Sequence, residues 1–278
     1  NEGNPGILPR SVEYMLKKKN IENEMDNNSA NKFDKKSKTR ILCQYYEIYN
    51  EECYDLLKDY SDIVRKSLKA KLDLSRSPSN SINKRNNRID IKSIIMGRLG
   101  VSDIIKNTKM KDNITEIEIL NYSHFQKILA YGIFNKSHAC TSLNDNSSRS
   151  HTIFNIILET ESVYPNKSFT IVDLAGSERA KRTETTGINF IEATKINLSL
   201  SVLGKCLETM KNNTLISNNG GIKKMSPIPF RESKLTMLFQ EFFMGEHIIT
   251  MITNINPRKA DYEETIRALN FSCVWKEI

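Results

Sequence analysis

The chain has 278 residues, a formal net charge of +8 and a pI near 9.1, a length that allows one large α/β domain or two small ones. Its five cysteines include no C-x-x-C pair and its four histidines lie far apart, so neither a zinc site nor a disulfide framework is indicated. No apolar run approaches the roughly 18 residues that span a bilayer, and residues 1–10 lack a signal-peptide pattern. We therefore expect an intracellular protein without membrane insertion.

The positive charge of the chain favours an acidic partner, because it creates a long-range attractive field. Much of the lysine lies in Asn/Lys/Ser-rich stretches such as 17–40 and 76–88, where a general compositional bias explains it equally well. Nucleic acid is one acidic candidate, but the sequence shows neither an aromatic stacking motif nor zinc-ligand spacing. We therefore expect a partner other than nucleic acid.

Four segments are rich in β-forming residues and predict strands. In chain order they are 41–49, 150–161, 168–176 and 247–257. The region 94–120 has a weaker pattern, and there we expect only short strands.

Three amphipathic helices are predicted in the second half of the chain. The first covers about 190–211, with an apolar stripe of Ile196, Leu200, Leu203, Leu207 and Met210. The second carries a stripe of Leu235, Leu238, Phe239 and Phe242. The third follows a capping-box pattern at Asp261 and Glu264, and its stripe is Tyr262, Ile266, Leu269 and Cys273. Strands that alternate with helices predict an α/β fold.

Two stretches interrupt this pattern, at 75–93 and 212–224. Both have little apolar periodicity and cannot bury enough surface to order themselves. We interpret them as low-complexity loop insertions.

The sequence DLAG at 173–176 follows an apolar strand, at the kind of strand end where open α/β sheets bind ligands. Asp173 can hold Mg²⁺ through its water shell, since this ion prefers one or two carboxylates together with phosphate oxygens. Gly176 lets a backbone N–H approach a terminal phosphate. An ordinary turn after a strand is the alternative interpretation.

The sequence NDNSSRSH at 144–151 places serines around Arg149, directly before another predicted strand. A solvent-exposed polar loop is one interpretation. The other is a functional pair with DLAGSER, in which Arg149 and Glu178 form an ion pair as both loops close over a phosphate. A solvated surface pair is the alternative for these two residues.

Motifs in the same order along the chain resemble the signature segments of the kinesin motor domain. They are YYEIYNEECYDLL (45–57), TSLNDNSSRSH (141–151), VDLAGSERAKRT (172–183), EATKINLSLSVLGKCLE (192–208), PIPFRESKLTMLFQE (227–241) and NINPRKADYEETIRALNFS (254–272). The resemblance implies a three-layer α/β fold of the P-loop NTPase class, with a central, mostly parallel or mixed sheet and helices on both faces. It also implies ATP and Mg²⁺ as cofactors.

The resemblance assigns roles to the serine-rich segment, which is similar to switch I. Ser148 would contact Mg²⁺, Ser147 would orient the attacking water, and Arg149 would pair with Glu178. In DLAGSE, which is similar to switch II, Asp173 would hold Mg²⁺ through water. The Gly176 amide would sense the γ-phosphate. Catalysis would then rest on positioning and charge neutralisation.

A cationic surface for acidic tubulin is also implied by the resemblance, in a cytoplasmic protein of the microtubule cytoskeleton. Its members would be Lys181, Arg182, Lys195, Arg231 and Lys234. Arg231 and Lys234 are three residues apart and would share one exposed face. For any single lysine a solvated charge is the alternative.

The chain departs from the family pattern at its start, because it contains no G-x-x-x-x-G-K-[ST] phosphate loop. We interpret residues 1–278 as a partial motor domain that does not hydrolyse ATP alone, while the complete protein is a microtubule-stimulated ATPase. The alternative is a non-hydrolysing microtubule-binding module. Assembly with the same or another chain, through coiled-coil regions outside this one, is also implied.

Overall fold

A computed structural model describes most of the chain. The described residues are 5–28, 39–64, 66, 114–140, 150–160, 166–176, 188–218, 225–245 and 247–275. Within helices, only the backbone is described at 22–28, 138–140, 188–197 and 218. The expected insertion at 75–93 lies outside these residues.

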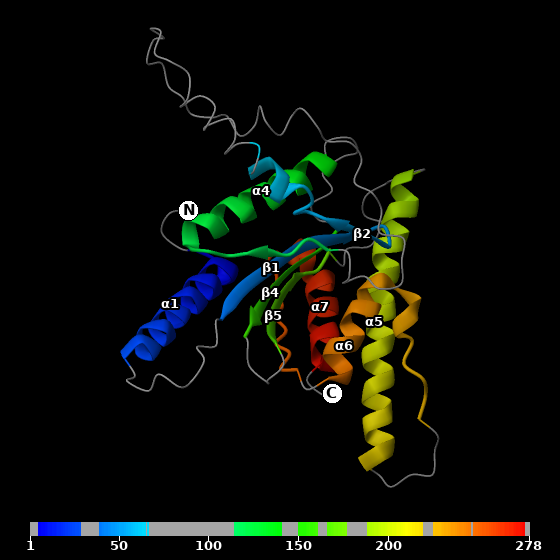
Figure 1. Ribbon diagram of the computed structural model, residues 1–278. Coiled ribbons are helices and arrows are strands. Elements are labelled where there is room, and N and C mark those ends of the chain that lie inside the picture. The colour runs from blue at the N-terminus through cyan, green and yellow to red at the C-terminus, as the bar shows by residue number, and fades with distance from the viewer. Residues whose placement is uncertain are drawn as a thin grey trace.

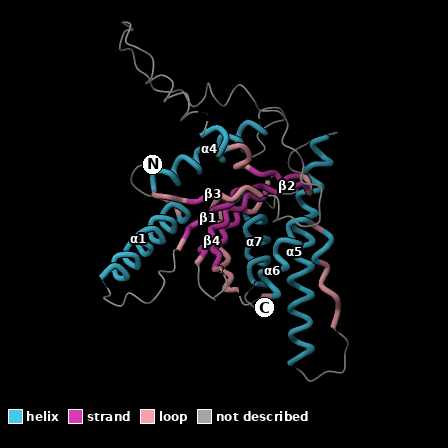
Figure 2. The backbone as a smooth tube through the Cα atoms, viewed as in Figure 1, coloured by secondary structure: helices cyan, strands magenta, loops and turns pink. Residues whose placement is uncertain are grey.

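A five-stranded sheet forms the middle of the molecule (Figures 1 and 2). Its strands are β1 (Arg40–Tyr49), β2 (Glu52–Asp55), β3 (Ile117–Glu118), β4 (His151–Glu159) and β5 (Lys167–Asp173). The order is β2-β1-β4-β5, with β3 also paired to β1. The strands predicted at 41–49, 150–161 and 168–176 are therefore confirmed.

Helices cover both faces of the sheet, as Figure 1 shows, so the predicted three-layer α/β arrangement is confirmed. One face carries α1 (Ile7–Asn28) and α4 (Tyr122–Cys140). The other carries α5 (Ile188–Asn218), α6 (Lys234–Met244) and α7 (Tyr262–Trp275). Two short 3-10 turns, η3 (Phe230–Glu232) and η4 (Lys259–Asp261), precede α6 and α7. None of the described helices is long and apolar enough to cross a membrane.

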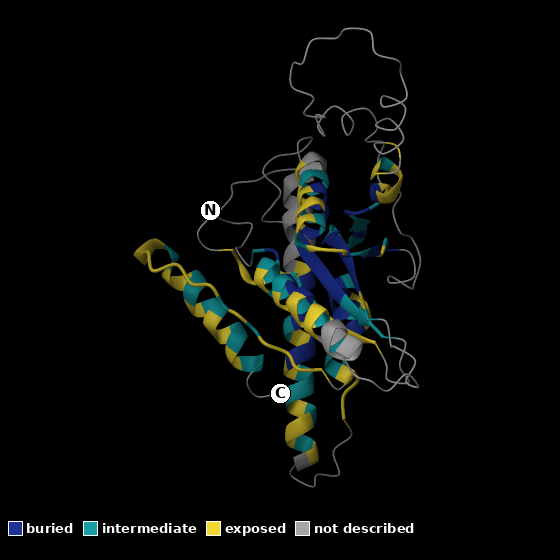
Figure 3. Ribbon diagram, turned by 60° about the vertical axis from the view of Figure 1, so that its left-hand side comes forward, coloured by how far each residue is buried: buried dark blue, intermediate teal, exposed yellow. Residues whose placement is uncertain are grey.

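Strand β1 is buried on both faces, because it lies between the two helical layers. Ile41, Cys43 and Tyr45 point into the core formed with α1 and α4. Tyr46 and Ile48 point into the core formed with α5 and α6. A strand covered on both sides needs a continuous apolar run rather than strict alternation, and Figure 3 shows the sheet as the buried centre of the molecule.

The relative orientation of the strands differs from the expectation, which was a mostly parallel or mixed sheet. All four strand pairs among the described residues are antiparallel. β1 and β4 pair over nine residues, from Arg40 opposite Glu159 to Ile48 opposite His151. The described strands thus form an antiparallel sheet inside an α/β layer arrangement.

The prediction of a strand at 247–257 is wrong. The backbone of these residues forms neither a strand nor a helix. Ile248 is 99% exposed and Ile252 is 64% exposed. A β-forming run becomes a strand only when a neighbour satisfies its backbone groups, and none of the described strands pairs with this segment.

Helix α5 confirms the predicted apolar stripe but is longer than expected. Leu203 and Leu207 are fully buried against the sheet. The helix continues through 212–218, so the loop expected at 212–224 is wrong for these residues, while 219–224 lie outside the described residues. The Asn213 side chain stabilises this extension, because it donates to the Ser226 carbonyl at 2.8 Å and accepts from the Ser226 amide at 2.9 Å.

Helix α7 forms where the sequence predicts it, but its predicted stripe does not become core. Tyr262 is 65% exposed, and Leu269 is 39% exposed. Instead Phe271, Val274 and Trp275 pack against the core of α5 and α6. The contacting face is therefore rotated from the one that residue spacing favours.

The β1–β2 turn anchors the start of α6. Asn50 and Glu51 have φ of 56° and 62°, the left-handed pair that a two-residue hairpin turn requires. The Glu51 carboxylate accepts from the Lys234 amide at 2.6 Å and from the Ser233 hydroxyl at 3.1 Å. A carboxylate at this position also complements the positive end of the helix dipole.

Two glycines give a test of packing in these layers. A Cβ at Gly132 in α4 would lie 2.1 Å from the buried Tyr45 ring, whereas one at Gly204 in α5 would lie 3.7 Å from Phe271. Alanine gains about 1 kcal/mol of helix propensity at either site, but at Gly132 it forces Tyr45 to shift at a cost of about 1–3 kcal/mol. We expect Gly132→Ala to lower the free energy of unfolding and Gly204→Ala to leave it equal or higher. Denaturant unfolding checks this, and equal effects would contradict the packing described.

Substitutions at Glu51 separate the capping contact from backbone strain. Glu51→Ala removes the two hydrogen bonds and keeps a Cβ in the left-handed conformation, so we expect a loss of about 1–3 kcal/mol in the free energy of unfolding. Glu51→Gly removes the same bonds but relaxes the turn, and its loss should be about 1 kcal/mol smaller. Thermal or denaturant unfolding measures both. A glycine variant less stable than the alanine variant would contradict this account.

Candidate functional site

Three strand ends meet at one end of the sheet, because β1, β4 and β5 are antiparallel neighbours. The register places Glu47 of β1 opposite Thr152 of β4, and Thr152 opposite Asp173 of β5. Ser150 immediately precedes β4, and the DLAG loop begins at Asp173. The described ends of the two predicted motifs therefore lie side by side.

Asp173 ends β5 with an exposed side chain. Its register partner Thr152 lies on the sheet face covered by α1 and α4, so Asp173 shares that face. Lys136 of α4 donates to the Thr152 hydroxyl. A carboxylate, a hydroxyl and an ammonium group thus gather along this strand end.

Glu47 continues this row into the protein and is 5% exposed. Burial raises the pKa of its carboxyl group, while the positive charge of Lys136 opposes that rise. The row Glu47–Thr152–Asp173 therefore runs from a buried acid on β1 to an exposed acid on β5.

His151 links the site to the opposite face of the sheet. Its Nδ1 accepts from the Ala175 amide of the DLAG loop at 3.0 Å, and its Nε2 lies 2.8 Å from the Ser199 hydroxyl of α5. His151 is 2% exposed, and burial lowers the pKa of its imidazole to about 4. A neutral imidazole therefore joins the loop after β5 to α5.

Sequence reasoning missed His151 as a site residue. It is the last residue of NDNSSRSH and the first residue of β4. Its position therefore predicts a motif end and a strand start, but no contact of its side chain. A single histidine has no spacing pattern that identifies its contacts. Its partners, Ala175 and Ser199, lie 24 and 48 residues away.

Several predicted site residues fall outside the described part of the chain. They are Ser147, Ser148, Arg149 and Glu178. The ion pair and the serine contacts therefore stay predictions. Gly176 is described and half-buried in the loop after β5, three residues after Asp173, the last residue of that strand.

The donor set suits a metal ion that arrives with phosphate. Among the described residues, no group of three His, Cys, Asp or Glu side chains is placed to hold a metal. Asp173 instead offers one exposed carboxylate at the strand end. Mg²⁺ commonly binds through one or two carboxylates, phosphate oxygens and water, so Asp173 fits this ion without a protein cage.

The predicted cationic surface is described only in part. Arg231 lies in η3 and is exposed, and Lys234 is the half-buried first residue of α6. Ser233 between them is extended, with φ −147° and ψ 147°. The two cations therefore belong to different elements, so their spacing of three residues does not place them on one turn of a helix, and their sharing of one exposed face stays a prediction.

The other three cations of that prediction are not tested by the structure. Lys195 lies in the backbone-only part of α5, while Lys181 and Arg182 lie outside the described residues.

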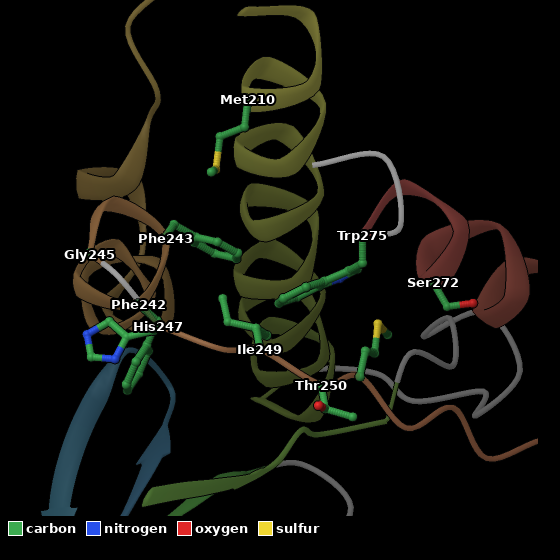
Figure 4. A pocket seen from close by; sticks show the side chains of 10 residues that line it. Met210, Phe242, Phe243, Gly245, His247, Ile249, Thr250, Ser272 and Trp275 are labelled. Atoms are coloured by element: carbon green, nitrogen blue, oxygen red, sulfur yellow. The ribbon is translucent and has the colours of Figure 1, made fainter. Parts of the chain in front are cut away.

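An apolar cavity of about 530 Å³ lies between α5, α6 and α7 (Figure 4). Phe243, Ile249 and Trp275 point into it, and Met210 of α5 lies at its edge. None of those predicted site residues that the structure describes lines it. It is thus separate from the row of polar residues at the strand ends.

The neutral state of His151 has a pH-dependent consequence. Its folded pKa of about 4 lies below the ordinary value of 6.5, so the unfolded chain binds more protons between these values. The free energy of unfolding should therefore fall as the pH drops from 6.5 towards 4, by up to about 3 kcal/mol from this residue. With only four histidines in the chain, carbon-13 NMR of labelled histidine can follow each imidazole. A midpoint near 6.5 for His151 would contradict the buried geometry.

Comparisons with known proteins agree with this arrangement. A mouse kinesin-like protein, KIF20B, is 34% identical over 241 residues, which cover 84% of this chain and 12% of the mouse protein. Human kinesin-like protein KIF20A is 33% identical over 249 residues, which cover 86% of this chain and 23% of the human protein. The chain thus spans less than a quarter of the length of either relative.

Solved kinesin structures match nearly the whole fold. A structure of the C-terminal motor and motor homology domain of Kar3Vik1 has a TM-score of 0.62 at 25% identity, covering 98% of this chain and 58% of that one. A structure titled kinesin 6 has a TM-score of 0.55 at 26% identity, covering 92% and 63%. The family model of the kinesin motor domain matches residues 1–278. The chain therefore belongs to the kinesin motor domain family.

Proposed function

We propose that the complete protein is a microtubule-based motor, in which ATP hydrolysis drives movement along the filament. The observation that carries this proposal is the meeting of two motifs at one sheet end, where the Ala175 amide bonds to His151. The serine-rich segment enters β4 there, and the DLAG loop leaves β5. Two loops that converge on one point suit a site whose loops close over a terminal phosphate.

Asp173 and Gly176 form the described half of the proposed nucleotide site. Asp173 would hold Mg²⁺ through water, and the Gly176 amide would sense the γ-phosphate of ATP. When bound, Mg²⁺ supplies positive charge that neutralises the phosphate oxygens. The exposed position of the Asp173 side chain at the strand end supports this role.

The serine-rich segment and Glu178 form the other half. Ser148 would contact Mg²⁺, and Ser147 would orient the attacking water. Arg149 would pair with Glu178 and hold both loops closed. Because Ser150 is buried beside the start of β4, the segment is anchored at its carboxyl end, which restricts where Arg149 can reach.

The filament-facing surface is proposed on the side of α5 and α6. Its cations would be Lys181, Arg182, Lys195, Arg231 and Lys234. The net charge of +8 supports attraction to acidic tubulin. We accordingly place the protein on microtubules in the cytoplasm, assembled with the same or another chain through regions outside this one.

Phosphate release by the full-length protein, with and without microtubules, tests the proposal. We expect microtubules to stimulate release, and Arg149→Ala to reduce the stimulated rate by about 100-fold, as for loss of a preorganised charged group at a reacting site. Arg267→Ala is the matched control, since Arg267 forms an exposed ion pair with Glu263 at 3.0 Å within α7.

Two outcomes would overturn the proposal. The first is a parent protein without microtubule stimulation, and the second is an Arg149→Ala variant that behaves like the parent. Co-sedimentation with microtubules that does not change with nucleotide would instead indicate a non-hydrolysing binding module.

A further inference from the structure

The contacts of His151 join three elements that are distant in sequence. Its backbone belongs to β4 and is paired with Ile48 of β1. Its two ring nitrogens bond to Ala175, 24 residues ahead, and to Ser199 of α5, 48 residues ahead. In the sequence, residues 177–187 separate the loop from α5. The imidazole connects the two directly through its hydrogen bonds.

The hydrogen-bond partners determine which ring nitrogen carries the proton. A backbone amide can only donate, so Nδ1 must accept from Ala175 and be unprotonated. Nε2 then carries the hydrogen of the neutral ring and donates it to the Ser199 hydroxyl. The ring therefore has a defined direction, accepting from the loop and donating to the helix.

Neither bond can be exchanged for a bond to bulk water without opening the structure. His151 and Ser199 are each 2% exposed, and Ala175 is 6% exposed. A buried donor or acceptor left without a partner costs about 1–3 kcal/mol. The loop and the helix are consequently held at hydrogen-bond distance from one ring.

The ring is also fixed on its sheet side. Ile48 and Ile153, beside it in the sheet, pack with Leu203 of α5 in one core, and these three side chains are no more than 1% exposed. The bonds of 3.0 and 2.8 Å have normal hydrogen-bond lengths, and a donor–acceptor separation of about 3.6 Å no longer makes a hydrogen bond. A shift of the loop must therefore break a bond or displace the ring and Ser199 with it.

We propose that His151 is a positioning residue that couples the loop carrying Gly176 to helix α5, through the bonds Ala175 N–H to Nδ1 and Nε2–H to Ser199 Oγ. The coupling itself rests on the described geometry. Its use in nucleotide-dependent filament binding rests on the proposed function.

Ser199→Ala tests the coupling directly, because the substitution lies on the helix while the readout lies on the loop. Alanine is the best helix former, so the variant should fold. We expect hydrogen exchange of the Ala175 amide to become about fivefold faster, although no bond to that amide has been removed. Thr209→Ala is the matched control, since its hydroxyl donates to the Lys205 carbonyl of the same helix at 2.7 Å.

His151→Asn distinguishes transmission through the ring from a general loosening of the core. The asparagine oxygen occupies the approximate position of Nδ1 and can accept from Ala175, but its amide does not reach Ser199. In this background, Ser199→Ala should no longer change exchange at Ala175. An unchanged Ala175 amide in the Ser199→Ala single variant, or an equal effect in both backgrounds, would overturn the coupling.

The functional consequence is measured in the full-length protein as the ratio of its microtubule dissociation constants with ADP and with a non-hydrolysable ATP analogue. We expect Ser199→Ala to bring this ratio about fivefold closer to one, and Thr209→Ala to leave it unchanged. A merely structural role would weaken binding equally in both states and preserve the ratio, which would overturn the use of the coupling. If the parent ratio is already one, the proposed function fails, while exchange at Ala175 still decides the coupling.

Discussion

The antiparallel pairing of β1 with β4 is the interaction on which the rest of the structure depends. Nine residue pairs fix its register, and the apolar side chains of β1 enter cores on both faces. A shift by one residue would exchange the two sets of side chains between faces, and would place Glu47 in the core of α5 and α6. The same register brings the start of β4 beside the end of β5.

Along each strand, the residues that form the core and the residues of the candidate site lie at different positions. Most side chains in the middle of β1 and β4 are apolar and buried, apart from Gln44 and Asn155, whose buried amides bond to each other at 3.0 Å. The strand ends carry Glu47, His151, Thr152 and Asp173. Polar groups at the ends are held in place by apolar pairs a few residues away, so their spacing is set by the sheet. His151 also fixes the position of α5 relative to the sheet, because one ring nitrogen bonds to the loop after β5 and the other to α5.

Local patterns predicted the elements that have a strong local signal. The strands at 41–49 and 168–176 and the stripe of Leu203 and Leu207 were found, because period and β-propensity are properties of adjacent residues. The prediction of a strand at 247–257 was wrong, because a strand needs a pairing partner and the sequence of the segment does not reveal one. In the site, Asp173 and Gly176 came from a motif. His151 and Glu51 were missed, because their partners Ser199 and Lys234 become neighbours only through packing.

We infer that the loop after β5 and helix α5 respond together to nucleotide. Hydrogen exchange of the full-length parent protein, with and without a Mg²⁺-bound non-hydrolysable ATP analogue, measures this at residues 174–176 and 198–203 in one experiment. We expect the analogue to slow exchange in both segments, over the same range of analogue concentration. Slowing in the loop with no change in the helix, or no change in either, would contradict it.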